Sequence, residues 1–177
     1  MSSFYQMTFC EEEKYQSFGV AYAHPDVDLF LLPKSGVRID SWESINLELR
    51  CGGYADYLSS DLGGRLCSEK LKDLIDQNIS DNDDIQWLDV NVIDDQKCKK
   101  YYFLHFPKNI PVINKDRSIF AGNMVVKVVL DTQLVSHLSI FTLPDEVGRT
   151  LFISEKLKKI ISKNNITGVS FSKSACI

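Results

Sequence analysis

The sequence predicts an α+β fold of mostly antiparallel strands, in a single domain that spans residues 1–177. Short segments rich in aromatic and β-branched residues recur along the chain between turn residues, which is typical of strands. Only two segments have the apolar spacing of an amphipathic helix. Runs of strands with helices set apart favour α+β over a doubly wound parallel sheet. With 177 residues, of which 44% are hydrophobic, the chain can bury a core without a metal or a disulfide.

The first 59 residues are expected to be rich in strands. Residues 45–51 alternate between apolar and polar side chains, which is the pattern of a half-buried strand. Pairs such as His24-Pro25 and Gly52-Gly53 mark turns between strands. The strands expected in this part are residues 4–9, 17–23, 27–32 and 45–51.

Two similar amphipathic helices are expected, and each begins after a serine. Ser68 and Ser154 are good N-caps, because a serine side chain accepts a hydrogen bond from the free N–H groups of the first turn. Apolar residues then follow at spacings of three and four. These stripes are Leu71, Leu74 and Ile75 in the first helix, and Leu157, Ile160 and Ile161 in the second.

The second half of the chain is expected to contain further strands. Residues 124–130 and 134–141 are expected to form an antiparallel hairpin that turns at residues 131–133. Gly168 is expected to take a left-handed conformation after the second helix. The other expected strands are residues 85–92, 101–106 and 168–171.

The two helical segments repeat a short sequence. LCSEKLKDLIDQN, which begins at Leu66, and FISEKLKKIISKN, which begins at Phe152, share Ser-Glu-Lys-Leu-Lys. The shared cap, stripe and following strand are consistent with an internal structural duplication. The alternative is coincidence, since Lys, Leu and Glu are common helix formers.

The net charge of −4 conceals an asymmetry between the two halves of the chain. Residues 1–95 hold 19 acidic and 7 basic side chains, a net charge of −12, and residues 96–177 hold 5 and 13, a net charge of +8. The stretch from Asp73 to Asp95 contains eight aspartates and no Lys or Arg. Two interpretations are open: a solvated face, or a negative surface that receives a cationic partner. An acidic protein is a poor candidate for binding nucleic acid, whose phosphates need Lys and Arg.

The end of the first helix and the strand after it form the expected partner-binding site. The aspartates here fall where the helix ends and the chain turns, so we expect them to be exposed. A carboxylate near the negative end of a helix opposes the helix dipole, which suggests that stability is not its role. The residues of this expected site are Asp76, Asp81, Asp83, Asp84, Trp87 and Asp89.

No catalytic, cofactor-binding or metal-binding residue is expected. His24, His105 and His137 lack the spacing of a zinc site, and the five cysteines form no Cys-x-x-Cys pair. A nucleophilic pair such as Cys51 with His105 is open in principle, but no feature of the sequence selects it. No segment reaches the roughly 20 apolar residues of a membrane span, and no secretion signal is visible. We therefore expect a cytoplasmic protein that does not bind a membrane.

Three linked motifs occur within residues 60–173. A Tyr-rich strand at residues 101–106 leads to an Asp116-Arg117-Ser118 loop, and a Ser-Glu helix later leads into a Thr-Gly-apolar-x-Phe strand. The positions of this last motif are Phe152, Ser154, Glu155, Leu157, Ile160, Ile161, Thr167, Gly168, Val169 and Phe171. Together the motifs resemble immunity family eleven of the bacterial polymorphic toxin systems.

The resemblance implies an immunity protein that is not an enzyme, and that binds a cognate secreted toxin and occludes its active site. A toxin that acts on nucleic acid or nucleotides would have a cationic cleft, in which clustered carboxylates can stand in for phosphates. The shared motifs are capping and packing residues, so the surface that contacts the toxin lies outside them. Two alternatives stay open: a non-toxin binding or scaffold domain that recognises a basic partner, and an enzyme that acts on a modified protein or nucleotide.

Overall fold

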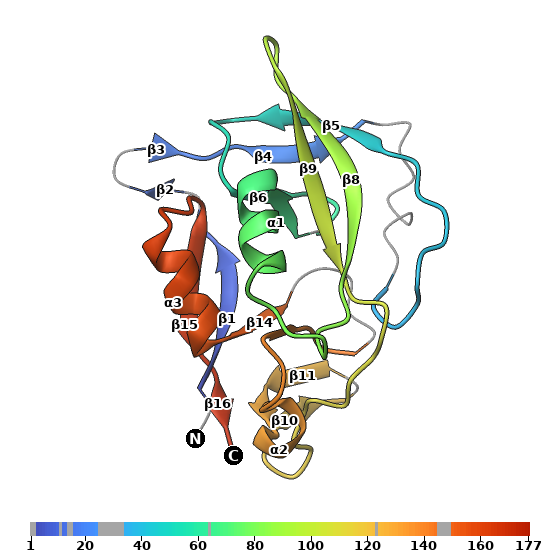
Figure 1. The fold of residues 1–177 in the computed structure, drawn as a ribbon, viewed down its shortest axis with the longest axis vertical. Coiled ribbons are helices and arrows are strands. Elements are labelled where there is room, and N and C mark those ends of the chain that lie inside the picture. Colours follow the sequence, from blue (N-terminus) through green and yellow to red (C-terminus); the bar gives the residue numbers. More distant parts are fainter. Residues whose placement is uncertain are drawn as a thin grey trace.

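The main feature of the computed structural model is a closed β-barrel (Figure 1). The structure describes residues 3–10, 12–13, 16–24, 34–63, 65–122, 124–144 and 150–177. The barrel strands follow the order β4-β5-β8-β9-β7-β6, and only the pairs β4–β6 and β5–β8 are parallel. Their bounds are β4 Val20–Ala23, β5 Ile45–Arg50, β6 Tyr57–Ser60, β7 Leu66–Ser68, β8 Gln86–Ile93 and β9 Cys98–His105. The α+β prediction agrees with this structure, whereas the sequence did not predict that the strands close into a barrel.

Apolar side chains that alternate along the strands fill the barrel. On β5, Leu47 and Leu49 are buried while Glu48 and Arg50 are exposed, as the alternation predicted. Tyr101 lies in this core and its hydroxyl donates to the carbonyl oxygen of Ala55 at 2.6 Å, because a buried hydroxyl needs a partner. The main core residues are Ala21, Leu47, Leu49, Leu58, Leu66, Leu88, Val90, Val92, Tyr101 and Phe103.

A second sheet of four strands packs below the barrel in Figure 1. Its order is β13-β14-β1-β15, and β1 is antiparallel to both neighbours. The N-terminal strand thus pairs with two strands from the C-terminal part of the chain. The bounds are β13 Ile140–Phe141, β14 Leu151–Ser154, β1 Phe4–Phe9 and β15 Val169–Lys173.

The expected hairpin of residues 124–130 and 134–141 is wrong. The Asp131 side chain accepts a hydrogen bond from Gln133 N at 3.0 Å and so begins a short helix, α2, where the turn was expected. The first expected strand is divided: β11 pairs with β10, and β12 pairs with β16 in parallel. The expected strand at residues 27–32 lies outside the described residues. The bounds of the minor elements are β2 Glu12–Glu13, β3 Gln16–Ser17, β10 Ile119–Ala121, β11 Met124–Lys127, β12 Val129–Leu130, α2 Thr132–Val135 and β16 Ala175–Cys176.

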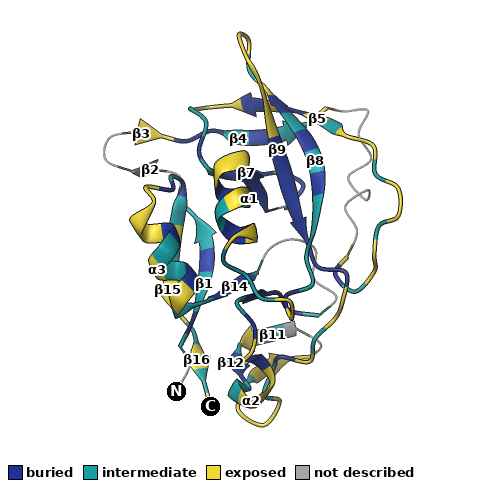
Figure 2. Cartoon of the chain, viewed as in Figure 1, coloured by how far each residue is buried: buried dark blue, intermediate teal, exposed yellow. Residues whose placement is uncertain are grey.

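Two longer helices, α1 (Glu69–Asp76) and α3 (Glu155–Lys163), pack into one core between the barrel and the second sheet. Each is N-capped by the serine that ends the preceding strand: Ser68 Oγ accepts from Leu71 N, and Ser154 Oγ accepts from Leu157 N. Figure 2 shows both helices with exposed residues on their outer faces. No helix in the described part of the chain is long and apolar enough to cross a membrane. The side chains buried on the inner faces are Leu71, Ile75, Leu157 and Ile161.

The two helices belong to units of the same topology. In the first unit β7, α1 and β8 follow one another, and β9 lies between β7 and β8 in the barrel. In the second unit β14, α3 and β15 follow one another, and β1 lies between β14 and β15. The inserted strand is antiparallel to both of its neighbours in each case. Both units are therefore split β-α-β motifs.

Gly168 joins the second unit to the barrel. Its φ is +74°, as expected after α3, and an added Cβ would clash with Tyr57 O and lie 2.6 Å from Ala55 Cβ. Only glycine permits both the left-handed backbone and this close approach.

We predict that Gly168→Ala lowers the free energy of unfolding by more than about 2 kcal/mol, because left-handed strain is added to a clash with backbone. Gly122→Ala is the matched control, since Gly122 has φ +60° with open space around its Cβ position, and it should cost only about 1 kcal/mol. Urea unfolding of both variants measures the difference. Equal costs for the two variants would contradict the close packing at Gly168.

Candidate partner-binding surface

The structure brings three of the expected site residues together on one face of α1 and β8, namely Asp76, Trp87 and Asp89. Trp87 lies on β8, and its Nε1 donates to Asp76 Oδ1 at 2.8 Å. Lys72, one turn earlier on α1, donates to Asp76 Oδ2 at 2.8 Å, and its ammonium nitrogen lies 5.8 Å from the Trp87 ring centroid. The Trp87 side chain is therefore held by a hydrogen bond at its edge and by a cation near its ring.

The same face continues onto β9. Asp89 lies two residues beyond Trp87 and forms an ion pair with Lys100 at 2.6 Å. Tyr102 packs edge to face on Trp87 with ring centroids 6.4 Å apart, and Lys100 lies 5.3 Å from the Tyr102 centroid. We call this surface the α1–β8–β9 face. Its residues are Lys72, Asp76, Trp87, Asp89, Lys100 and Tyr102.

Charges on the α1–β8–β9 face are balanced within the chain. The sequence stretch from Asp73 to Asp95 has no Lys or Arg, but Lys72, one helical turn before Asp76, pairs with it, and the pairing of β8 with β9 brings Lys100 to Asp89. The hydrogen bond to Asp76 raises the pKa of Lys72, and the hydrogen bond to Asp89 raises the pKa of Lys100. These lysines therefore stay protonated, and the face is a mosaic of both charges rather than a continuous negative surface.

The remaining expected residues lie in the turn after α1 and differ in their environments. Asp81 is exposed and has no hydrogen bond or ion pair with any described residue. Asp84 is half-buried and pairs with Arg38 at 3.2 Å and with Lys108 at 2.8 Å.

The expectation that Asp83 is exposed is wrong, because its side chain is buried. One carboxylate oxygen accepts from Ser80 N at 2.8 Å and Ser80 Oγ at 2.9 Å. The other accepts from Ser139 N at 2.7 Å and Ile140 N at 3.1 Å. Asp83 thus fixes the turn after α1 to the start of β13, and a partner could not reach it without unfolding this junction.

We predict that Asp83→Ala lowers the free energy of unfolding by about 3 kcal/mol, because it leaves buried amide groups without an acceptor. Asp81→Ala, two residues away and exposed, should stay within about 0.5 kcal/mol of the wild type. Chemical denaturation followed by circular dichroism compares the two. A cost for Asp83→Ala as small as that of Asp81→Ala would contradict its structural role.

A hollow of about 340 Å³ lies beside this face, at the N-terminus of α1. Lys70, Lys99 and Lys100 line it together with Tyr54 and Tyr101. The two tyrosine rings stack with centroids 6.3 Å apart, and Lys99 Nζ lies 4.3 Å from the Tyr54 centroid. The hollow can therefore receive a side chain or backbone group of a partner through cations and aromatic rings.

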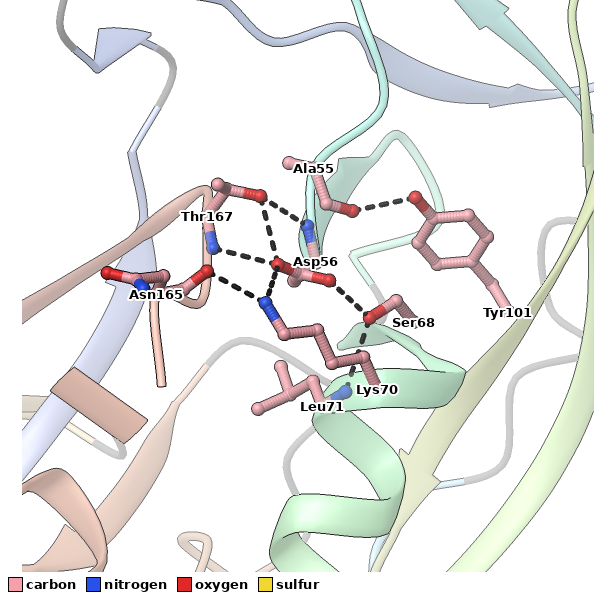
Figure 3. Close-up of polar contacts among 8 residues, drawn as sticks. All are labelled: Ala55, Asp56, Ser68, Lys70, Leu71, Tyr101, Asn165 and Thr167. Atoms are coloured by element: carbon pink, nitrogen blue, oxygen red, sulfur yellow. Dashed lines mark hydrogen bonds and ion pairs between the residues drawn. The ribbon is translucent and has the colours of Figure 1, made fainter. Parts of the chain in front are cut away.

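Asp56 also lines the hollow and was missed by the sequence analysis. Its Oδ1 accepts from Ser68 Oγ at 2.7 Å, and its Oδ2 accepts from Thr167 N at 3.0 Å and Thr167 Oγ1 at 3.1 Å (Figure 3). Lys70 Nζ lies 3.6 Å from Oδ2 and donates to Asn165 O at 2.9 Å. No local sequence signal could reveal this site, because the partners lie 12 and 111 residues away from Asp56.

The two serine caps should therefore differ in their contribution to stability. Ser154→Ala should cost about 1 kcal/mol, the usual value of an N-cap. Ser68→Ala should cost about 1 kcal/mol more, because it also removes a hydrogen bond to a carboxylate. Urea denaturation measures both variants. Equal losses would show that the contact between Ser68 and Asp56 contributes nothing.

The two residues named for a possible nucleophilic pair, Cys51 and His105, differ in their environments. His105 is buried, its Nε2 lies 2.6 Å from Val37 O, and burial lowers its pKa. Cys51 is exposed, and Cys67 is buried with a raised pKa because burial disfavours its thiolate. Among the described residues, no three His, Cys, Asp or Glu side chains gather to hold a metal ion.

The fold and the α1–β8–β9 face can now be set beside the comparison with known families. Residues 42–175 match the immunity protein family Imm11. This match covers most of the 177 residues, so the chain belongs to the Imm11 family. The family resemblance that the motifs indicated is confirmed, and it extends to β5 beyond the residues first expected. No curated protein matches the chain.

Proposed function

We propose that this chain binds a cognate toxin protein and neutralises it by occluding the toxin's active site. Its membership of an immunity protein family is the observation that carries this proposal. In this proposal the chain acts in the cytoplasm, by binding rather than by catalysis. The toxin is a protein, so the contact surface must offer both an apolar anchor and specific charges.

The α1–β8–β9 face is the proposed contact surface. Trp87 is its anchor, because large aromatic side chains contribute most to interface affinity. Asp76 and Tyr102 already fix the orientation of the indole, so little side-chain entropy is lost on binding. Asp81, which lies nearby in sequence and is exposed, adds a carboxylate at the edge of this surface.

Asp76, Asp84 and Asp89 would contact the toxin by exchanging partners. Each now pairs with a lysine or an arginine of this chain, and cations on the toxin would compete for the same carboxylates. Such exchange favours specificity and association rate more than affinity. Asp83 takes part indirectly, by holding the turn that carries Asp81 and Asp84.

The alternative is a binding or scaffold domain for a basic protein that is not a toxin. The same aromatic face would serve this role, because its geometry does not depend on what the partner does. Co-expression with the protein encoded by the adjacent open reading frame separates the two, since only an immunity protein restores growth.

We also propose that the two split β-α-β units arose by internal duplication. Three similarities support this: the shared Ser-Glu-Lys-Leu-Lys sequence, the Ser68 and Ser154 caps, and the strand inserted within each unit. The duplication concerns the architecture and assigns no chemistry.

We predict that Trp87→Ala weakens binding to the protein encoded by the adjacent open reading frame by at least about 30-fold, the loss typical of an interface anchor. Asp89→Lys should slow association and reduce its dependence on salt. Binding kinetics of purified proteins at two salt concentrations measure both effects.

Matched controls exist on β4 and β5, which carry no residue of the α1–β8–β9 face. Tyr22 lies under Arg50 at 5.1 Å, as Trp87 lies near Lys72, and Glu48 pairs with Arg50 as Asp89 pairs with Lys100. Tyr22→Ala and Glu48→Lys should bind within twofold of the wild type. If Trp87→Ala binds as well as Tyr22→Ala does, the contact surface lies elsewhere.

A further inference from the structure

The β10–β11 hairpin exposes large apolar side chains at the end of the molecule away from the β8–β9 turn (Figure 1). Ile119 is 54% exposed, Phe120 is 42% exposed and Val126 is 64% exposed. The register of the two strands shifts between Ile119 and Phe120. Single exposed apolar residues are common in proteins, but three on one short hairpin mark an interaction site.

The base of this hairpin is held firmly by the core below it. Ser118 Oγ accepts from Val129 N at 2.9 Å and donates to Val129 O at 3.3 Å, and Asn114 N donates to Val129 O at 2.8 Å. Val129 and Leu130 of β12 are buried. The exposed side chains are therefore presented by a preorganised element, which lowers the entropic cost of binding.

Basic side chains flank this hairpin along the chain. Lys115 and Arg117 precede the hairpin and Lys127 ends it, and all three are exposed. None of them forms an ion pair with a described residue, in contrast to the paired charges of the α1–β8–β9 face. Asp116 is the single acidic residue between positions 115 and 127. A partner that matches this region therefore carries carboxylates around an apolar centre.

A hollow of about 470 Å³ borders the hairpin along β11. Val125, Val126 and Lys127 line one side of it, and Phe152 and Lys173 line the other. The described residues that line it include two lysines and no carboxylate. In addition, β10 and β11 form a two-stranded sheet, and no third strand of the described residues pairs with their outer edges.

We propose that the β10–β11 hairpin is a second docking surface for the toxin, and that it receives an extended toxin segment with apolar side chains flanked by carboxylates. This inference rests on the proposed function. The segment lies along the edge of β11, with which no described strand pairs, and adds a strand there. Its apolar side chains contact Ile119, Phe120 and Val126, and its carboxylates pair with Arg117 and Lys127.

The test measures binding of the purified chain to the protein encoded by the adjacent open reading frame. The triple variant Ile119→Ser, Phe120→Ser, Val126→Ser should weaken binding at least 100-fold, and Arg117→Glu with Lys127→Glu should slow association at low salt. Val37→Ser is the control, because Val37 is 60% exposed and lies outside the hairpin. It should bind within twofold of the wild type.

Hydrogen exchange of the wild-type complex keeps the test independent of variant folding. The amides of residues 119–127 should gain protection on binding. If the hairpin variants bind as the wild type does and these amides stay unprotected, this inference is overturned while the proposed function stands. If the wild-type chain neither binds that protein nor restores growth, the proposed function fails and the inference fails with it.

Discussion

The carboxylate of Asp56 links the two halves of this fold. It accepts hydrogen bonds from Ser68, which caps α1, and from Thr167, which precedes Gly168. Asp56 therefore fixes the barrel to the loop after α3. Backbone bonds from Tyr57 N to Thr167 O and from Cys10 N to Gly168 O, each 3.0 Å long, extend the same junction. The position of α1, and with it the α1–β8–β9 face, depends on this contact.

The charge pattern of the sequence is rearranged by folding. Five aspartates that lie close together in the acidic stretch have three different environments in the structure. Asp83 is buried at a junction, and Asp81 is exposed to solvent. The other three, Asp76, Asp84 and Asp89, form ion pairs. The local negative field of the acidic stretch is thus weaker than the sequence suggests, because the cation beside each paired carboxylate offsets most of its field at a distance. In the proposed function, recognition at this face depends on local exchange of ion pairs around an aromatic side chain.

The two proposed contact surfaces have different chemistry. The α1–β8–β9 face offers an indole held between charged groups, and the β10–β11 hairpin offers apolar side chains with unpaired cations. Both lie within the residues that match the Imm11 family. A partner that contacts both surfaces must carry cations where it meets the first and carboxylates where it meets the second. A protein without this arrangement would leave desolvated charges unpaired, so most unrelated proteins are excluded.

Local patterns in the sequence predicted strands β1, β4, β5, β8, β9 and β15, the two serine-capped helices and the left-handed Gly168, because each depends on residues close together along the chain. Motifs spread over residues 60–173 indicated the family. The tertiary structure alone decided the barrel closure, which requires β4 and β9 to meet partners far away in sequence. It also decided the role of each aspartate: the sequence places Asp81 and Asp83 two residues apart, but only the amides of Ser139 and Ile140, brought from 56 and 57 residues away, bury one and leave the other exposed.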